Sequence, residues 1–193
     1  NWDSAQTVTL TGINDDVIDV NTQTTVTISV ADGSSNDEYD DVANQTITVT
    51  TTDNDTASFT KSEATQTVTE GGGTDTFTLV LGAEPASDVV LRVTSADTGE
   101  VTVGTADYTF TNGNWDSAQT VTLTGIDDNV DDGDINTTVT ITVVDASSND
   151  EFDSLADQTI TVTTTDNETA SYTKSQTTRT VTEASGGGNT ATF

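Results

Sequence analysis

The sequence predicts an all-β chain made of antiparallel β-sandwiches in tandem, and three observations lead to this prediction. The segment at residues 1–13 recurs letter for letter at 114–126, an offset of 113 residues. Apolar residues alternate with threonine through much of the chain, which is the period of a strand with one buried face. Glycine, aspartate and asparagine cluster between these runs and mark loops. A fixed offset of this length indicates copies of one domain.

The repeat divides the chain into three parts. The correspondence continues without a gap to Glu70, which matches Glu183. We therefore expect the C-terminal half of one repeat at 1–56, a complete repeat at 57–168 and the start of the next at 169–193. A half sandwich exposes an apolar face and unpaired strand edges. Two interpretations stay open: the chain is cut from a long polymer, or neighbouring chains complete its partial copies.

The complete repeat is expected to hold about seven short strands. We place them, in order, near 57–62 with 66–70, 75–82, 88–95, 100–103, 107–111, 119–126, 137–144 and 159–165. The clearest runs alternate Phe77, Leu79 and Leu81 with threonines, or Val121 and Leu123 with threonines. Threonine is β-branched and suits an exposed strand face. Seven such strands in about 110 residues are typical of an immunoglobulin-like sandwich.

The charge of the chain excludes several classes of partner. There are 33 acidic and four basic residues, giving a formal net charge of −29. Such a chain repels phosphate backbones and anionic membrane surfaces, so we expect no nucleic-acid partner. No run approaches the roughly 18 consecutive apolar residues of a membrane span, so we expect no direct membrane insertion.

The missing residue types argue against an enzyme. Cysteine, histidine and methionine are absent, which removes disulfides and the Ser-His and Cys-His catalytic pairs. Paired carboxylates can hydrolyse glycosides, but aromatic residues make up only 5% of the chain and suggest no aromatic-lined cleft. The composition suits a large secreted bacterial surface protein. Trp115 is expected to cap one end of the core.

The acidic residues avoid the strands and crowd the loops. One group lies at 127–134 and a second at 166–168, with single acids at other strand ends; the candidate ligands are Glu70, Glu100, Asp127, Asp128, Asp131, Asp132, Asp134, Asp166 and Glu168. Alternate loops of a sandwich share one end, so we expect these side chains to meet there. Neighbouring carboxylates repel unless a cation neutralises them. Ca²⁺ takes six to eight oxygen ligands in flexible geometry, which favours calcium over magnesium here. A solvated acidic surface is the competing interpretation.

The preceding partial copy repeats most of these acids. The corresponding candidate ligands are Asp15, Asp16, Asp19, Asp53 and Asp55. Asp131 is matched by Ile18 and Asp134 by Asn21, so the first site is expected to bind fewer ions or to bind them more weakly.

A separate acidic group at 147–153 matches residues 34–40 and is expected at the opposite end of the sandwich. Two interpretations stay open: a second ion site, or an acidic turn plugged by an aromatic residue, Phe152 or Tyr39.

The central copy resembles the Calx-beta domain, a calcium-binding sandwich of sodium–calcium exchangers and many bacterial surface proteins. The matching features are Ala57-Ser58-Phe59, Val68-Thr69-Glu70 before a glycine turn, the run from Gln119 to Asp128, and Thr164-Thr165-Asp166-Asn167-Glu168. The resemblance implies Ca²⁺ near the domain junction, with ligands at Glu70, Asp127, Asp128, Asp132, Asp166 and Glu168, and also Glu100. The chain departs from the family at Asn129, where a third acid is common, and at 131–134, where glutamates are common.

We therefore expect a calcium-binding structural repeat of a long extracellular bacterial protein, in which Ca²⁺ at each junction stiffens a rod or filament. Its partners would be neighbouring repeats or copies of the same chain, head to tail. The alternative is an adhesin domain that binds a ligand or surface through exposed threonine-rich strand faces.

Overall fold

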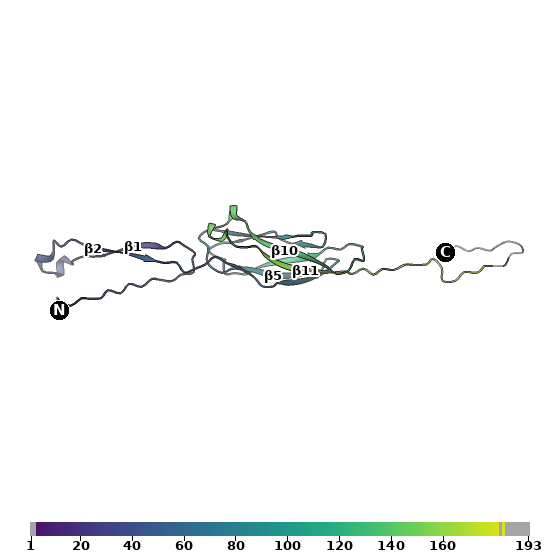
Figure 1. Cartoon of the computed structure of the whole chain (residues 1–193), viewed down its shortest axis with the longest axis horizontal. Helices are drawn as coiled ribbons and strands as arrows, with labels where there is room; N and C mark the ends of the chain where they lie inside the picture. Colours follow the sequence, from purple (N-terminus) through teal and green to yellow (C-terminus); the bar gives the residue numbers. More distant parts are fainter. Residues whose placement is uncertain (1–2, 182, 184–193) are drawn as a thin grey trace.

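The computed structural model describes residues 3–181 and 183, and confirms the predicted all-β fold with sandwich-like sheets. The N-terminal part contributes a two-stranded antiparallel hairpin, β1 (Thr22–Ile28) and β2 (Gln45–Thr51). The strands of the sandwich follow, and Figure 1 shows the hairpin and the sandwich end to end along the long axis. Within the described residues, no helix has the length and apolar character required to span a bilayer.

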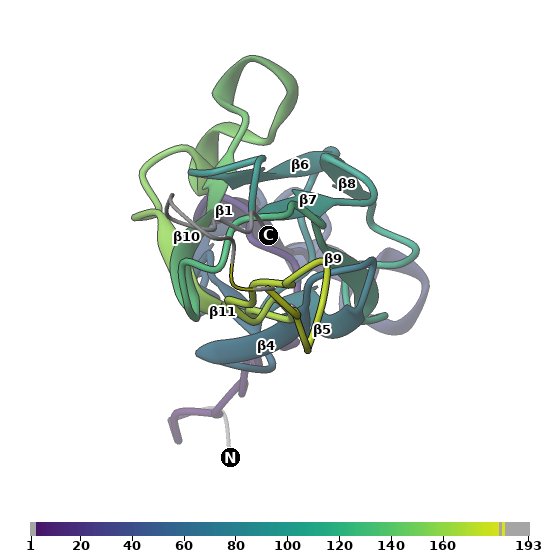
Figure 2. The same ribbon diagram turned by 90° about the vertical axis from the view of Figure 1, so that its right-hand side faces the viewer.

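Two sheets form the sandwich. Its strands are β3 (Phe59–Lys61), β4 (Thr65–Thr69), β5 (Thr74–Leu81), β6 (Val89–Ser95), β7 (Val101–Val103), β8 (Asp107–Phe110), β9 (Gln119–Gly125), β10 (Ile135–Val143) and β11 (Gln158–Thr165). One sheet has the order β4–β11–β10–β6–β8 and the other has the order β3–β5–β9–β7. Figure 2, viewed along the chain, shows β4 beside β11 and β5 beside β9.

The sandwich differs from the prediction in two respects. Its described strands number nine rather than about seven, partly because the ranges 57–62 and 66–70 form separate strands: β3 pairs with β5 in one sheet, and β4 pairs with β11 in the other. One pairing also departs from the antiparallel pattern of the other strands, since β4 and β11 run parallel, with Thr69 opposite Thr165. Both strands therefore end at the same end of the sandwich.

The core is built from the apolar residues of the alternating pattern. Leu79, Val121, Leu123, Val139 and Ile160 are all fully buried between the sheets. Burying such a side chain stabilises the fold by roughly 1.5–3 kcal/mol. The intervening residues are largely threonines, and several of them are exposed on the outer faces. Trp115 packs against this core, as expected, and its carbonyl accepts a 3.1 Å hydrogen bond from the Leu81 N–H.

Short 3-10 turns close the end of the sandwich where β10 finishes. They are η3 (Asp145–Ser147) and η4 (Asp150–Phe152), and their counterparts beyond β1 are η1 (Asp32–Ser34) and η2 (Asp37–Tyr39). Phe152 is completely buried, which confirms it as an aromatic plug, whereas Tyr39 is 60% exposed and plugs nothing. Between residues 3 and 56, the described part of this copy, the strands are only the β1–β2 pair, so no second sheet covers Tyr39 there.

Candidate metal centre

Glu70 reaches the end of the sandwich through the parallel pairing of β4 with β11. The last paired residues are Thr69 and Thr165, and the Glu70 N–H donates to the Thr165 carbonyl at 3.2 Å. Glu70 and Asp166 are therefore the first residues beyond two neighbouring strands that end together. The parallel register brings their carboxylates to one place.

Glycines allow the chain to leave Glu70 and the other sheet to approach it. Gly71 and Gly72 have φ angles of 75° and 89°, a region that favours glycine. At Gly125, the last residue of β9, a Cβ atom would lie 2.3 Å from the Thr69 carbonyl oxygen. Glycine there lets the end of β9 lie against the end of β4. The 127–134 loop therefore starts beside Glu70.

Hydrogen bonds tie the 127–134 loop to the residues after β11. Asp166 accepts from the Gly133 N–H at 2.7 Å and from the Glu168 N–H at 2.8 Å. The Asn167 side-chain amide donates to Asp127 at 3.2 Å. The two acidic loops that the sequence placed at one end do meet there.

Glu100 joins the same end from β7. Its carbonyl accepts a 2.8 Å hydrogen bond from the Ile126 N–H, because Val101 lies opposite Gly125 in the pairing of β7 with β9. The side chain of Glu100 thereby comes beside Asp128 and Asp132, at the start and middle of the acidic loop.

Six carboxylates form two groups of three. Glu70, Asp166 and Glu168 make one group, and Glu100, Asp128 and Asp132 make the other; within each, one oxygen per residue lies within 4.8 Å of the others. Oxygens that bind one Ca²⁺ at about 2.4 Å are at most about 4.8 Å apart. Both groups therefore have the spacing of oxygens that share one ion.

Three buried carboxylate oxygens in these groups have no hydrogen-bond partner. They are the Oε2 atoms of Glu70, Glu100 and Glu168, and Glu70 is only 6% exposed. A buried polar atom without a partner costs about 1–3 kcal/mol, and more when it is charged. A bound cation would satisfy these oxygens, so the residues present fit a hard divalent ion with oxygen ligands.

The pKa values of these carboxyl groups are shifted by burial, by their neighbouring charges and by hydrogen bonding. The neighbouring Glu70 carboxylate, to which a protonated Glu168 could donate, together with burial and the charges of Glu70 and Asp166, raises the pKa of Glu168 to about 7. Burial and then the charges of Asp132 and Asp97 raise the pKa of Glu100. Backbone N–H groups of Glu168 and Gly133 lower the pKa of Asp166. The carboxyl groups of Glu168 and Glu100 thus resist ionisation, whereas that of Asp166 ionises more readily.

Three of the sequence-predicted ligands lie outside both groups. Asp127 accepts from Asn167, Asp131 accepts from the Ala170 N–H at 2.6 Å, and Asp134 accepts from the Asp166 N–H at 3.2 Å. Their contacts hold the loop and the linker. Sequence reasoning did not single out Asp97, which lay in a segment interpreted only as a loop.

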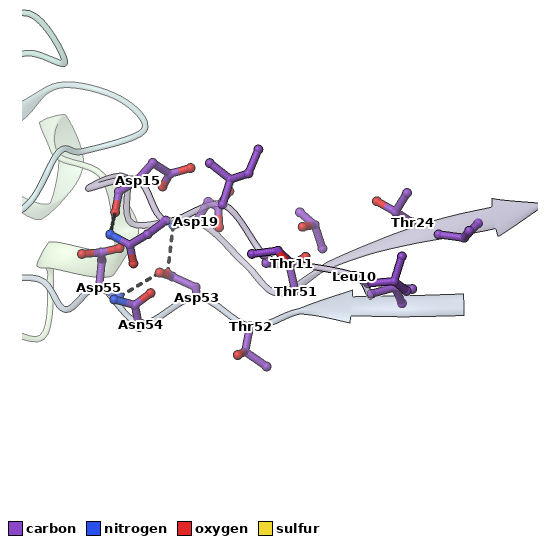
Figure 3. A pocket seen from close by; sticks show the side chains of 16 residues that line it. Leu10, Thr11, Asp15, Asp19, Thr24, Thr51, Thr52, Asp53, Asn54 and Asp55 are labelled. Carbon is purple, nitrogen blue, oxygen red and sulfur yellow. Dashed lines mark hydrogen bonds between the residues drawn. The ribbon is translucent and has the colours of Figure 1, made fainter. Parts of the chain in front are cut away.

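The partial copy reproduces the local bonding of this loop. Asp53 accepts from the Asp19 N–H at 3.1 Å and from the Asp55 N–H at 2.8 Å, and Asp15 accepts from the Val17 N–H at 3.2 Å. Figure 3 shows Asp15, Asp19, Asp53 and Asp55 together beside the end of the hairpin. Burial and then the charges of Asp53, Asp16 and Asp15 raise the pKa of Asp55. Among the described residues, these acids form no group of three as close as those of the complete repeat.

The other acidic group lies at the opposite end, as expected from connectivity. One oxygen of Asp153 is buried there without a partner, and burial together with Asp145, Asp150 and Glu151 raises its pKa. Asp153 as a whole is only half-buried. The described residues at this end contain no comparably close carboxylate trio.

Comparisons with known proteins assign no function. No family model matches the chain, and no curated protein matches it. Among solved structures it is similar to the MSP-domain-like protein SSP-19 of Caenorhabditis elegans, at 17% identity and TM-score 0.40, over 55% of this chain and 99% of that one. It is also similar to the periplasmic chaperone SfaE, at 6% identity and TM-score 0.44, over 57% of each chain. A third match is to domains 4 and 5 of the S-layer protein SbsC, at 20% identity and TM-score 0.46, over 76% of this chain and 60% of that one.

Proposed function

We propose that the chain is a calcium-binding structural repeat of a long extracellular bacterial surface protein, of the Calx-beta type that its motifs resemble. The observation that carries the proposal is the buried, unpartnered carboxylate oxygen of Glu70 beside Asp166 and Glu168. A structural acid of this kind needs a cation or a proton, and three carboxylates together favour the cation. The second group at Glu100, Asp128 and Asp132 supports a site with more than one ion.

The ligands would join segments that lie far apart in the sequence. They come from the ends of β4 and β11, the start of β7 and the loop between β9 and β10. When bound, Ca²⁺ supplies the charge that lets these segments lie together. Glu168 immediately precedes Thr169, so the same ion would fix the exit towards the next repeat. Neutralising the junction would stiffen a rod of successive repeats.

An extracellular setting agrees with the expected affinity. Calcium modules of extracellular proteins bind with a Kd of roughly 10⁻⁴–10⁻³ M, and extracellular calcium concentrations are high enough to occupy such sites.

The exposed threonines do not support the adhesin alternative, since Thr138 and Thr161 pair across β10 and β11 as in an ordinary solvent-facing sheet.

The test is thermal unfolding of the full chain in calcium, in magnesium and in chelator. An ion bound only by the native state stabilises by mass action, about 2.7 kcal/mol at 100 times its Kd. For a chain of this size that raises the Tm by roughly 5–10 °C. Glu70→Gln should lose most of the rise. Asp116→Asn removes the same charge from an exposed position before β9 and should keep it. No calcium-dependent rise, or an equal rise in Glu70→Gln, would overturn the proposal.

A further inference from the structure

The turn between β5 and β6 receives the acidic loop of the preceding copy. The Glu84 N–H donates to the Asp16 carbonyl at 2.8 Å, and the Ile18 N–H donates to the Glu84 carbonyl at 2.9 Å. Val17 and Glu84 form a parallel β-bridge. A loop of one copy is thus paired with the backbone of the next.

Ile18 anchors this contact. Its side chain is only 5% exposed and belongs to the core cluster of the sandwich, which also includes Ala83 of the receiving turn. Two residues further on, Val20 is 72% exposed. Ile18 is therefore the apolar residue of this loop that has entered the neighbouring copy's core.

The loop is also fixed on its own side. The Val17 N–H donates to Asp15, and the Asp19 N–H donates to Asp53 in the linker. The linker then enters the sandwich through Ala57, which packs against its core. Two attachments therefore join the copies: the covalent linker and the Ile18 contact. With the linker alone the two copies could rotate about it as a hinge, whereas a second, separate attachment restricts this rotation.

We propose that the β5–β6 turn is a docking surface for the loop equivalent to 15–19 of a preceding repeat, with Ile18 as the anchor that sets the angle between repeats. The partner is the neighbouring repeat of the same chain. The contact consists of backbone hydrogen bonds and apolar burial, so it does not depend on ion binding. The anchor position is variable: the complete repeat has Asp131 there, whose carboxylate accepts from the Ala170 N–H instead. Junctions preceded by isoleucine and by aspartate should therefore differ in stiffness.

The test measures the distance distribution between the hairpin and the sandwich in the full chain. The chain has no cysteine, so Thr46→Cys and Thr94→Cys provide two unique exposed positions for spin labels, one on β2 and one on β6. The unsubstituted loop should give one narrow peak. Ile18→Asp, which places at this junction the residue found in the complete repeat, should lose that peak and give a broad distribution. Val20→Asp adds the same charge at an exposed neighbour and should stay narrow.

A second variant tests the backbone pairing. Glu84→Pro removes the N–H that donates to Asp16 and should also broaden the distribution, while an unchanged sandwich Tm shows that the fold persists. A narrow peak in Ile18→Asp, or equal broadening in Val20→Asp, would overturn the docking proposal. Repeating the series in chelator separates calcium stiffening from the docking contact. If chelator broadens the distance distribution of the unsubstituted chain, bound ions stiffen the junction. The broadening caused by Ile18→Asp should appear both with and without calcium.

Discussion

The β1–β2 hairpin and the β10–β11 hairpin have related sequences and the same pairing, yet different burial. Val26 lies opposite Ile47 in the first, and Val139 lies opposite Ile160 in the second, which is the same register at the repeat offset. Ile47 is 50% exposed, however, whereas Ile160 is fully buried. The strands need only each other to pair, but they need a second sheet to bury their apolar face.

The acidic loops show the same contrast. The bonding of Asp53 in the partial copy parallels that of Asp166 in the complete one, because these contacts join residues close to the hairpin itself. The close carboxylate groups also require Glu70 and Glu100, which come from the other half of the sandwich. A local motif shapes the loop, and the distant strands complete the candidate ion site.

The largest expected effect compares the burial of two leucines, Leu123 and Leu10, at equivalent positions of the complete and partial copies. Leu123→Ala should lower the free energy of unfolding by about 2–5 kcal/mol, because the side chain is fully buried and leaves a cavity. Leu10→Ala removes the same atoms from the equivalent position, which is 46% exposed beside a groove of about 370 Å³. It should cost less than about 1 kcal/mol. Urea unfolding measures both, and equal losses would contradict the comparison.

The next effect tests the ion sites in the two copies. Glu168→Gln removes a carboxylate from a close group of three, and should weaken calcium binding at least about tenfold, since even outer-shell changes cost 10–100-fold. Asp55→Asn makes the same charge change at the equivalent position and should leave the tighter binding step intact. Calcium titration by calorimetry distinguishes them. If Asp55→Asn weakened that step as much as Glu168→Gln, the partial copy would carry an equally competent site.

The sequence predicts the features that depend on local patterns, and it does not predict those that depend on contacts between distant strands. The alternation around Val121 and Leu123 predicted a strand and its buried face, because both depend on a local period of two. The ranges 57–62 and 66–70 located β3 and β4, but not their assignment to different sheets, because that depends on pairing with distant strands. The parallel pairing of β4 with β11 joins residues nearly 100 positions apart and leaves no local pattern.

The sequence predicted which acidic residues lie at the candidate site better than it predicted how they divide into two close groups. Acids at strand ends predicted that Glu70 and Asp166 would meet, and they do. The same rule could not separate Asp132, which lies in a close group, from Asp131, which instead bonds the linker. That difference depends on side-chain direction within one loop. The Ile18 contact was also missed, although an isoleucine in place of Asp131 was the signal that could have revealed it.

A smaller effect tests the 3-10 turns. Asn149 accepts from the Glu151 N–H at 3.1 Å, donates to Ser87 and is only 6% exposed. Asn36 makes the same cap to the Glu38 N–H at 3.0 Å but is exposed. Asn149→Ala should cost about 1–2 kcal/mol through the lost cap and the unpaired buried groups. Asn36→Ala should change stability by roughly 0.5 kcal/mol or less. Equal costs in urea unfolding would show that burial does not strengthen the cap.

The smallest expected effect is the pH dependence of the calcium-free chain, because solvent reaches part of the site. The pKa of Glu168 is raised from 4.5 to about 7 by the Glu70 carboxylate, to which its protonated form could donate, and by burial and neighbouring charge. A carboxyl with a raised folded-state pKa favours the folded chain fully below its unfolded value, and this contribution is lost as pH rises through about 7. In chelator the Tm should therefore fall between pH 5 and pH 8, and Glu168→Gln should flatten the fall while Asp116→Asn should not. The lowered pKa of Asp166 acts in the opposite direction but only below its ordinary value of 3.8, outside this window. A Tm that rose with pH in chelator would mean that the carboxylates around Glu168 ionise without repulsion, and the structural reason for a cation there would be lost.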